Sequence, residues 1–327
     1  MKKLIAVLLC VAITLCLPAC KKDEPNKITI VLDWTPNTNH TGIFVAEANG
    51  YFKEAGLNVE IVQPPEGGAE ALVASGKAQF GVSFQDSLAP AFAGDNALPV
   101  TAVAAIIQHN TSGIISRKGE GMHTPKGLEG KKYATWDMDV EKETIREVMK
   151  THGGNFDLVE LIPSTITDEV SALKSRSVDA IWVFYGWAGV ACQVAGIETD
   201  YFEFADINPV FDYYTPVIIG NNAWLSENPE TAKAFLEALS KGYNYAVENP
   251  EDAADILMDA APELKSNSEL VYESQKYLAN EYIADASKWG EFDSGRWAAF
   301  YGWLNEKKLL EEKIDPDFGF TNEYLPE

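Results

Sequence analysis

Short apolar runs alternate with helix-like segments along the first two thirds of the chain. Apolar runs of about four to eight residues bounded by turn residues are typical of buried strands. In the first part of the chain these runs occupy residues 28–32, 57–62, 79–83 and 100–107, and helical composition appears at 43–48, up to Gly76 and at 85–94. Repeated strand–helix–strand units predict a mainly parallel α/β sheet with right-handed crossovers.

The same alternation resumes near Gly113 and predicts a second sheet. Strands are expected at 132–135, 158–162, 178–183 and 215–219, with helices at 140–151 and 167–175. Beyond residue 219 the pattern is nearly all helical, and Pro229 and Pro250 each fall in the first turn of an expected helix. Helical patterns continue at 266–283 and 294–304.

This order of elements predicts two α/β lobes joined by a two-strand hinge, with a helical C-terminal tail that packs back on the first lobe. We expect the crossovers near residues 112–117 and 214–219. Lobe 1 would then comprise residues 28–113 and 217–327, and lobe 2 residues 114–216. The lobes should move about residues near 114–116 and 215–217, because few contacts cross there.

The first 27 residues have the pattern of a targeting segment. A basic start at Lys2 and Lys3 precedes an apolar core, residues 4–15, that is too short for a stable membrane anchor. Leu17-Pro-Ala-Cys20 resembles the lipobox of bacterial lipoproteins, in which the cysteine is lipidated and becomes the first mature residue. We expect a signal peptide at 1–19 and a lipidated tether at 20–27; the alternative is an ordinary secretory signal cut nearby.

Cysteine content agrees with this interpretation. Cys10 and Cys16 leave with the signal peptide and Cys20 would carry lipid, so Cys192 is the remaining thiol and no internal disulfide can form. No later stretch of the sequence is apolar enough to span a bilayer. We therefore expect an extracytoplasmic body in the cell envelope, held to the membrane by its lipid.

Composition predicts a globular body with an acidic surface. Hydrophobic residues make up 46% of the chain and charged residues 23%. The formal charge of −23 becomes −25 without residues 1–19, because 24 basic residues then face 49 acidic ones. Such a surface argues against nucleic acid as a partner and disfavours polyanionic ligands.

The first expected strand is followed by a loop that is dense in hydrogen-bonding groups, Asp33-Trp-Thr-Pro-Asn-Thr-Asn-His-Thr-Gly42. Open α/β sheets bind ligands at the carboxyl ends of their strands, where this loop lies. Trp34 offers a flat apolar face, and Asn37, Asn39 and His40 offer donors and acceptors. The loop predicts a ligand site, although Asn, Thr and Gly are also ordinary turn residues.

Other strand ends supply further candidates. Gly67 and Gly68 open a helix, so their N–H groups either face a polar ligand or simply form a turn. Trp136 follows the expected strand at 133–135, and Tyr185 and Trp187 project from the end of another. Flat aromatic side chains stack well on a planar ring, so we expect these three in the cleft.

Trp182 and Phe184, in the strand just before Tyr185, are expected in the core and not in the cleft. Alternation along the expected strand places Trp182 and Phe184 on one face and Val183 and Tyr185 on the other. Aromatic residues in such strands are more often packed in the core than exposed to a ligand. We therefore predict that Trp182 and Phe184 belong to the core.

Six ordered motifs resemble the thiamine-pyrimidine-binding group, which comprises substrate-binding lipoproteins of bacterial ABC importers and is similar to the yeast thiamine pyrimidine synthase. The resemblance covers nearly the whole mature chain. The motifs are Asp33–Gly42, Gln63-Pro-Pro-Glu-Gly-Gly68, Ala78-Gln-Phe-Gly81, Ile107-Gln-His-Asn-Thr-Ser-Gly113, Phe184-Tyr-Gly-Trp187 and Asp212-Tyr-Tyr-Thr-Pro-Val217.

The resemblance implies the type II periplasmic-binding-protein fold, in which two lobes close on one small ligand. It adds Asn110 and Asp212, which lie within the motifs, to the candidate ligand-binding residues. Members of the group bind formylaminopyrimidine, a thiamine precursor, or riboflavin and other aromatic heterocycles. The implied partners are an ABC permease with its ATPase, and the binding protein itself is expected to be a monomer without a cofactor.

Two departures from the group affect function. The yeast enzyme implies a cysteine-rich iron site, a lysine that bears pyridoxal and an active-site histidine, whereas Cys192 is the single cysteine of the mature body, so His40 is at most a binding remnant. The group usually has Gly-Trp-Glu-Gly where this chain has Gly186-Trp-Ala-Gly189. Ala188 cannot supply the carboxylate expected to hold the amino edge of a pyrimidine, which leaves Asp212, Asn37 or Asn39 as acceptors.

Two other functions stay open at this point. An aromatic cage could bind a quaternary ammonium ligand such as choline. A hydrolase or synthase is disfavoured, because the sequence contains no nucleophile elbow, zinc motif or phosphate loop.

Overall fold

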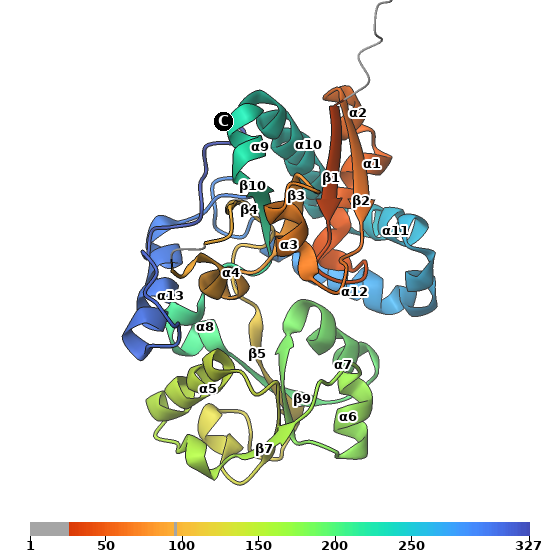
Figure 1. Ribbon diagram of the computed structural model, residues 1–327. Helices are drawn as coiled ribbons and strands as arrows, with labels where there is room; N and C mark the ends of the chain where they lie inside the picture. Colours follow the sequence, from red (N-terminus) through yellow and green to blue (C-terminus); the bar gives the residue numbers. More distant parts are fainter. Residues whose placement is uncertain (1–25, 95–96) are drawn as a thin grey trace, which may run out of the picture.

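The structure, a computed structural model, describes residues 26–94 and 97–327. The predicted signal peptide, Cys20 and most of the predicted tether lie outside these ranges. The chain forms two lobes, which lie one above the other in Figure 1, and each lobe is built on a five-stranded sheet.

The first sheet has the strand order β2-β1-β3-β10-β4. β1 pairs in parallel with β2 and β3, whereas β10 is antiparallel to β3 and β4. The sheet is therefore mixed: β1, β2, β3 and β4 run in one direction, as a mainly parallel sheet requires, and β10, which enters from the other lobe, runs against them. The strands are β1 (Asn26–Val31), β2 (Leu57–Val62), β3 (Phe80–Ser83), β4 (Val100–Ala105) and β10 (Val217–Asn221).

The second sheet repeats this arrangement with the order β7-β6-β8-β5-β9. β5 comes from the first lobe and runs antiparallel to β8 and β9, while β6 is parallel to β7 and β8. The edge strand β9 is absent from the sequence prediction because it is short and polar, with one buried residue, Phe202. The strands are β5 (Ser112–Arg117), β6 (Lys132–Thr135), β7 (Glu160–Pro163), β8 (Ala180–Phe184) and β9 (Thr199–Glu203).

The chain crosses between the sheets at residues 106–111 and 204–216. The first crossover precedes the predicted position, because residues 112–117 form β5 and pair on both sides within the second sheet. Residues 114–116, where the hinge is predicted, thus lie inside β5 and pair with β8 and β9. The second crossover ends where β10 begins at Val217.

Helices cover both sheets and form most of the C-terminal part, as the pattern predicts (Figure 1). In the described ranges the α-helices are α1 (Thr41–Ala48), α2 (Tyr51–Glu54), α3 (Gly68–Ala74), α4 (Gln85–Phe92), α5 (Asp139–Thr151), α6 (Glu169–Ser175), α7 (Val190–Val194), α8 (Phe204–Ile207), α9 (Asn222–Glu227), α10 (Pro229–Glu248), α11 (Pro250–Ala260), α12 (Ser268–Glu281) and α13 (Ser294–Lys307). Short 3₁₀ turns are η1 (Thr38–His40), η2 (Pro125–Leu128), η3 (Phe156–Leu158), η5 (Pro209–Phe211) and η6 (Pro262–Asn267), and η4 (Tyr185–Gly189) is a π-helical turn. None of the described helices is both long and apolar enough to cross a membrane.

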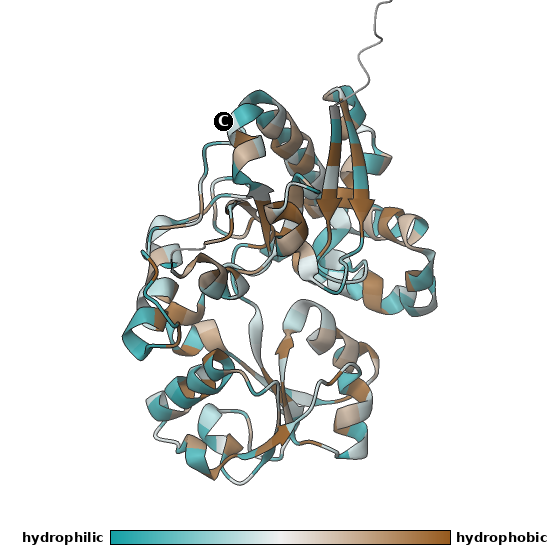
Figure 2. Ribbon diagram, in the orientation of Figure 1, coloured by the Kyte–Doolittle hydropathy of each residue, from teal (hydrophilic) through white to brown (hydrophobic). Residues whose placement is uncertain are grey.

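Strand alternation divides the core of the first lobe into two layers. Ile30 of β1 and Ile218 of β10 belong to the cluster beneath α1 and α10, whereas Val31 and Val217 belong to the cluster on the opposite face, with α3 and α4. Successive strand residues point to opposite faces, so both faces must be apolar to be covered by helices. In Figure 2 much of the strand ribbon in this lobe is brown, that is hydrophobic.

The C-terminal helices fix the position of the segment that follows the first strand. α10 crosses α1 so closely that a Cβ atom on Gly242 would lie 2.0 Å from the Gly42 carbonyl oxygen. The hydroxyl of Tyr243 on α10 donates to the Asn39 carbonyl at 2.7 Å, and the Tyr282 hydroxyl donates to that of Thr38 at 2.6 Å. The tail therefore holds the loop that the sequence identifies as a ligand site.

Candidate functional site

A cavity of about 450 Å³ lies between the lobes, where the loops at the carboxyl ends of several strands meet. Both lobes contribute to its wall, which is the arrangement expected for a ligand that bridges them. The first lobe supplies Asp33, Trp34, Asn37, Asn39 and Phe84, and the second crossover supplies Thr215 and Pro216. The second lobe supplies Trp136, Thr165, Ile166, Thr167, Glu169, Trp182, Val183, Phe184, Trp187 and Ala188.

Aromatic side chains form much of this wall and several of them are exposed. Trp34 is 53% exposed, Trp136 43% and Phe184 38%. Large apolar side chains in a concave site are usually covered by a ligand, because leaving them in water is unfavourable. Of the aromatic candidates, the structure brings Trp34, Trp136 and Trp187 to the cavity.

His40 supports the first loop rather than lining the cavity. The ring is fully buried, its Nδ1 accepts the Asn37 N–H at 3.2 Å, and its Nε2 lies 2.6 Å from Asp33 Oδ1. Because Nδ1 accepts, Nε2 carries the proton and donates to Asp33. His40 therefore orients Asp33, which does line the cavity, although it was absent from the predicted site residues.

The side-chain amides of Asn37 and Asn39 differ in whether they are free to bond a ligand. Asn37 uses its side chain locally, since Oδ1 accepts the Asn39 N–H at 2.9 Å and Nδ2 donates to the Thr35 carbonyl at 3.1 Å. The Asn39 side chain lines the cavity and forms no hydrogen bond with another residue in the described ranges. Asn39 is thus the loop amide that can bond a ligand.

The second wall is set by a π-helical turn that alternation could not predict. Tyr185 lies outside the cavity, because the turn directs its ring toward Tyr201 and Tyr277, with centroid distances of 4.8 and 5.3 Å. Phe184 lines the cavity, so the prediction that it is a core residue is wrong. Trp182 is buried as predicted, at 6% exposure, and one side of it also reaches the cavity.

The glycine pair at the start of α3 also lies outside the cavity. A Cβ atom on Gly68 would lie 2.8 Å from Glu70 Oε2, so the Glu70 side chain is folded against this turn. Glu70 Oε1 in turn accepts the Ser83 hydroxyl at 2.6 Å. Gly67 and Gly68 therefore form a turn against which the Glu70 side chain of α3 is folded, and they do not contact the cavity.

Asn110 and Asp212 connect the two crossover segments instead of lining the cavity. Asp212 accepts the Asn110 N–H at 2.9 Å and His109 Nδ1 at 2.8 Å, and Asn110 Nδ2 donates to the Phe211 carbonyl at 2.8 Å. The hydrogen bond to Asp212 raises the pKa of His109 to about 9, against the opposing effect of burial. A protonated His109 thus ties the crossovers together at neutral pH, and Asp212 is not available to a ligand in this arrangement.

Charge in the cavity has one sign. Asp33 and Glu169 are its ionisable lining residues, and none of the described residues that line it is Lys, Arg or His. Burial raises the pKa of Glu169, and the charge of Asp168 adds to this effect. The cavity therefore favours neutral or positively charged ligands over anions.

The residues that the sequence interpretation missed follow one rule. Phe84 follows β3, and the segment 165–169 follows β7, so both lie at carboxyl ends of strands. The rule that identified the loop after the first strand would have identified them too.

Two buried polar atoms in lining residues, Trp182 Nε1 and Thr215 Oγ1, have no hydrogen-bond partner within the described ranges.

The lining residues do not fit the cofactor chemistry of the synthase. No lysine lies among the described lining residues to bear pyridoxal, and His40 is occupied by Asp33 and Asn37. Cys192 is a free, buried thiol, and residues 26–94 and 97–327 contain no group of three or more His, Cys, Asp or Glu side chains that could hold a metal ion.

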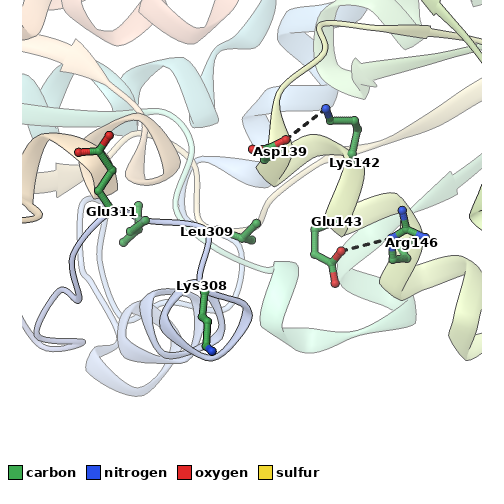
Figure 3. A pocket seen from close by; sticks show the side chains of 8 residues that line it. Asp139, Lys142, Glu143, Arg146, Lys308, Leu309 and Glu311 are labelled. Carbon is green, nitrogen blue, oxygen red and sulfur yellow. Dashed lines mark ion pairs between the residues drawn. The ribbon is translucent and has the colours of Figure 1, made fainter.

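A second hollow, of about 560 Å³, lies on the outer flank between α5 and the chain after α13 (Figure 3). Four of its charged side chains are paired within the wall, with Lys142 Nζ 3.1 Å from Asp139 and Arg146 Nε 3.4 Å from Glu143. None of the described residues that line it is aromatic. The interlobe cavity is therefore the better candidate site.

The fold and the interlobe cavity define a periplasmic-binding-protein-like protein. The periplasmic aliphatic sulphonate binding protein SsuA from Escherichia coli has the same fold, with a TM-score of 0.68 over 90% of this chain and 97% of that chain at 14% identity. The NMT1/THI5 like family model matches residues 37–253, and the chain belongs to this family. These results confirm the family and the fold that the sequence motifs imply.

Two relatives of the chain differ in activity. The chain is 28% identical to the formylaminopyrimidine-binding protein of Halalkalibacterium halodurans, over 90% of this chain and 89% of the relative. It is 26% identical to the 4-amino-5-hydroxymethyl-2-methylpyrimidine phosphate synthase THI13 of Saccharomyces cerevisiae, over 92% of this chain and 88% of the relative. The family thus contains both binders and enzymes, and the site must decide between them.

Proposed function

We propose that this protein is the substrate-binding component of an ABC importer and captures a planar nitrogen heterocycle between its lobes, with formylaminopyrimidine as the first candidate. The observation that carries this proposal is the interlobe cavity itself, whose exposed aromatic wall is made by both lobes. A planar ring can stack on Trp34 or Trp136 while its edges meet Asn39 and the acidic groups. The binding-protein relative supports the same ligand class.

Binding without turnover is supported by the chemistry of the wall. It contains aromatic, amide, hydroxyl and carboxylate groups, and the described lining residues include no lysine, cysteine or histidine to act as a nucleophile or to bear a cofactor. A phosphorylated pyrimidine would also bring negative charge beside Asp33 and Glu169. We therefore place the protein with the binders of the family and not with its synthases.

A quaternary ammonium ligand such as choline is the second candidate. Several aromatic faces and two carboxylates surround the cavity, and this combination attracts cations. The Asn39 amide and the long flat aromatic wall favour a ring with polar edges, because a quaternary ammonium group has no hydrogen bond to offer them.

Ligand binding should bring the lobes together about residues 106–111 and 204–216. Contacts already bridge the lobes on both flanks: Ser274 of α12 donates to the Gly186 carbonyl, and Lys307 of α13 lies 2.6 Å from Glu147 of α5. A ligand that contacts both walls binds the closed arrangement better, and this difference drives closure. We expect saturation with formylaminopyrimidine to give a measurable heat of binding and a smaller radius of gyration in small-angle scattering.

Choline and riboflavin serve as the comparison ligands in the same calorimetric titrations. If choline binds and the heterocycles do not, a quaternary ammonium compound is the ligand class and the heterocycle proposal is wrong. Heat of binding with an unchanged radius of gyration would contradict closure, and conversion of the bound pyrimidine to a product would contradict the assignment as a binder.

We also propose that lipidated Cys20 holds the protein at the membrane, as the lipobox-like run predicts. Replacing Cys20 by Ser should release the protein in soluble form or leave the precursor uncleaved. Membrane fractionation with mass spectrometry of the mature N-terminus measures both results. Normal membrane retention together with an unmodified Cys20 in the wild-type protein would contradict this assignment.

A further inference from the structure

The two carboxylates of the interlobe cavity are not equivalent. Asp33 accepts a hydrogen bond from His40, and its side chain is 11% exposed. Glu169 is half-buried, and within residues 26–94 and 97–327 it forms no ion pair. Glu169 is therefore the carboxylate of the cavity that remains available to a ligand.

Glu169 lines the same cavity as Ala188, the position at which the family motif has a glutamate. Ala188 and Cys192 belong to one apolar cluster, four residues apart in η4 and α7, and residues of α6 complete the same cluster. Burial raises the pKa of the Cys192 thiol to about 11, and among charged groups the Glu169 carboxylate contributes most to this shift. Both Glu169 and Ala188 line the cavity, so a ligand held there can meet the Glu169 carboxylate on the wall that includes Ala188.

We propose that Glu169 is the specificity-determining acceptor of the cavity and receives a hydrogen bond from the amino group of a bound aminopyrimidine. It takes the place of the carboxylate that Ala188 cannot supply. This inference rests on the proposed function and names the residue and the ligand chemistry for that function. Glu169 therefore replaces Asp212 as the expected acceptor, because the Asp212 carboxylate already accepts hydrogen bonds from His109 and Asn110.

The position of the carboxylate defines which heterocycles fit. A ring that presents an N–H donor or a positive charge to Glu169 forms a charge-assisted hydrogen bond in a partly desolvated site. A ring whose corresponding edge carries an acceptor or an anion meets repulsion instead. The small Ala188 side chain also leaves space beside Glu169, so a substituted amino group or a larger ring can be accommodated.

Calorimetry with four variants tests this assignment. The probes are formylaminopyrimidine and the same ring without its amino group. Glu169→Gln keeps the side-chain shape and removes the charge, and it should weaken formylaminopyrimidine binding about tenfold or more. The ring without an amino group should bind wild type and Glu169→Gln within about twofold of each other, because it has no donor to lose.

The second variant moves the carboxylate. Ala188→Glu combined with Glu169→Gln should recover at least part of the lost affinity, whereas Ala188→Glu alone should not increase it, because two carboxylates would then face each other. Glu160→Gln is the matched control, since Glu160 is exposed on β7 of the same lobe and does not line the cavity. Its affinity should equal that of the wild-type protein.

The outcomes separate this inference from the proposed function. Tight binding of formylaminopyrimidine by the wild-type protein and equally tight binding by Glu169→Gln would overturn the role of Glu169 and leave the proposed function intact. Failure of the wild-type protein to bind any aminopyrimidine would overturn the proposed ligand class and this inference together.

Discussion

Replacing Trp34 by Ala is expected to weaken ligand binding by about 30- to 100-fold while leaving the thermal stability almost unchanged. More than half of the Trp34 surface is exposed at the cavity, so the side chain contributes little to the folded core. If a stacked ring removes about 100 Å² of this surface from water, the loss is worth about 2.5 kcal/mol. At ~1.4 kcal/mol per tenfold change in affinity, that corresponds to the stated range.

Titration calorimetry with formylaminopyrimidine and thermal unfolding measure the two effects separately. Trp34→Phe should retain much of the affinity, because a smaller aromatic face remains. Phe318→Ala removes another exposed aromatic side chain, 43% exposed and remote from the cavity, and its affinity should match the wild type. A Trp34→Ala variant with undiminished affinity would show that the ring does not stack on this residue.

The sequence predicted the parts of the site that depend on strand order. Strand signals at residues 28–32 and 132–135 placed Trp34 and Trp136 at strand ends, and the fold brings both to one cavity. This succeeds because buried strands have strong apolar runs and because their carboxyl ends meet at one edge of a sheet. Asp33, Phe84 and Glu169 obey the same geometry but lack a distinctive side chain, so composition alone did not distinguish them.

The failures arise where backbone geometry changes within a few residues. Period-two alternation cannot continue into the π-helical turn at 185–189, so Tyr185 turns away from the cavity, whereas Phe184, the last residue of β8, lines it. Asn110 and Asp212 lie in motifs near the cleft, but they bond each other across the two crossovers. A sequence motif indicates that its residues act together. It does not distinguish residues that contact a ligand from residues that fix the backbone by hydrogen bonds.

Replacing Glu141 by Ala should give the largest loss of stability and should also weaken binding, although Glu141 does not line the cavity. Its carboxylate is buried beneath the turn that carries Trp136. Oε1 accepts the Tyr133 hydroxyl at 2.5 Å and the Trp136 N–H at 3.2 Å, and Oε2 accepts the Thr135 hydroxyl at 3.0 Å. One side chain therefore fixes the end of β6 and the start of α5.

The size of the effect follows from the donors that would be left without a partner. The Tyr133 and Thr135 hydroxyls are almost fully buried, and each unsatisfied buried donor costs about 1–3 kcal/mol. Glu141→Ala should therefore lower the free energy of unfolding by about 3 kcal/mol or more. Glu141→Gln, which keeps one acceptor oxygen, should lose less.

Binding should suffer because the turn that carries Trp136 depends on these bonds. Asp137 adopts a left-handed conformation with φ of 63°, and its N–H donates to the Thr135 hydroxyl oxygen, which is itself held by Glu141. Without Glu141 the turn can relax, and Trp136 no longer occupies one fixed position opposite Trp34. Ligand affinity should fall at temperatures well below the unfolding transition, where the protein is still folded.

Thermal unfolding and calorimetry on Glu141→Ala, Glu141→Gln and Asp139→Ala test this argument. Asp139 is an exposed carboxylate at the start of the same helix, so its variant controls for the loss of negative charge there. The expected order of both stability and affinity is wild type close to Asp139→Ala, then Glu141→Gln, then Glu141→Ala. Equal losses for Asp139→Ala and Glu141→Ala would show that helix charge, and not the buried hydrogen bonds beneath Trp136, determines the result.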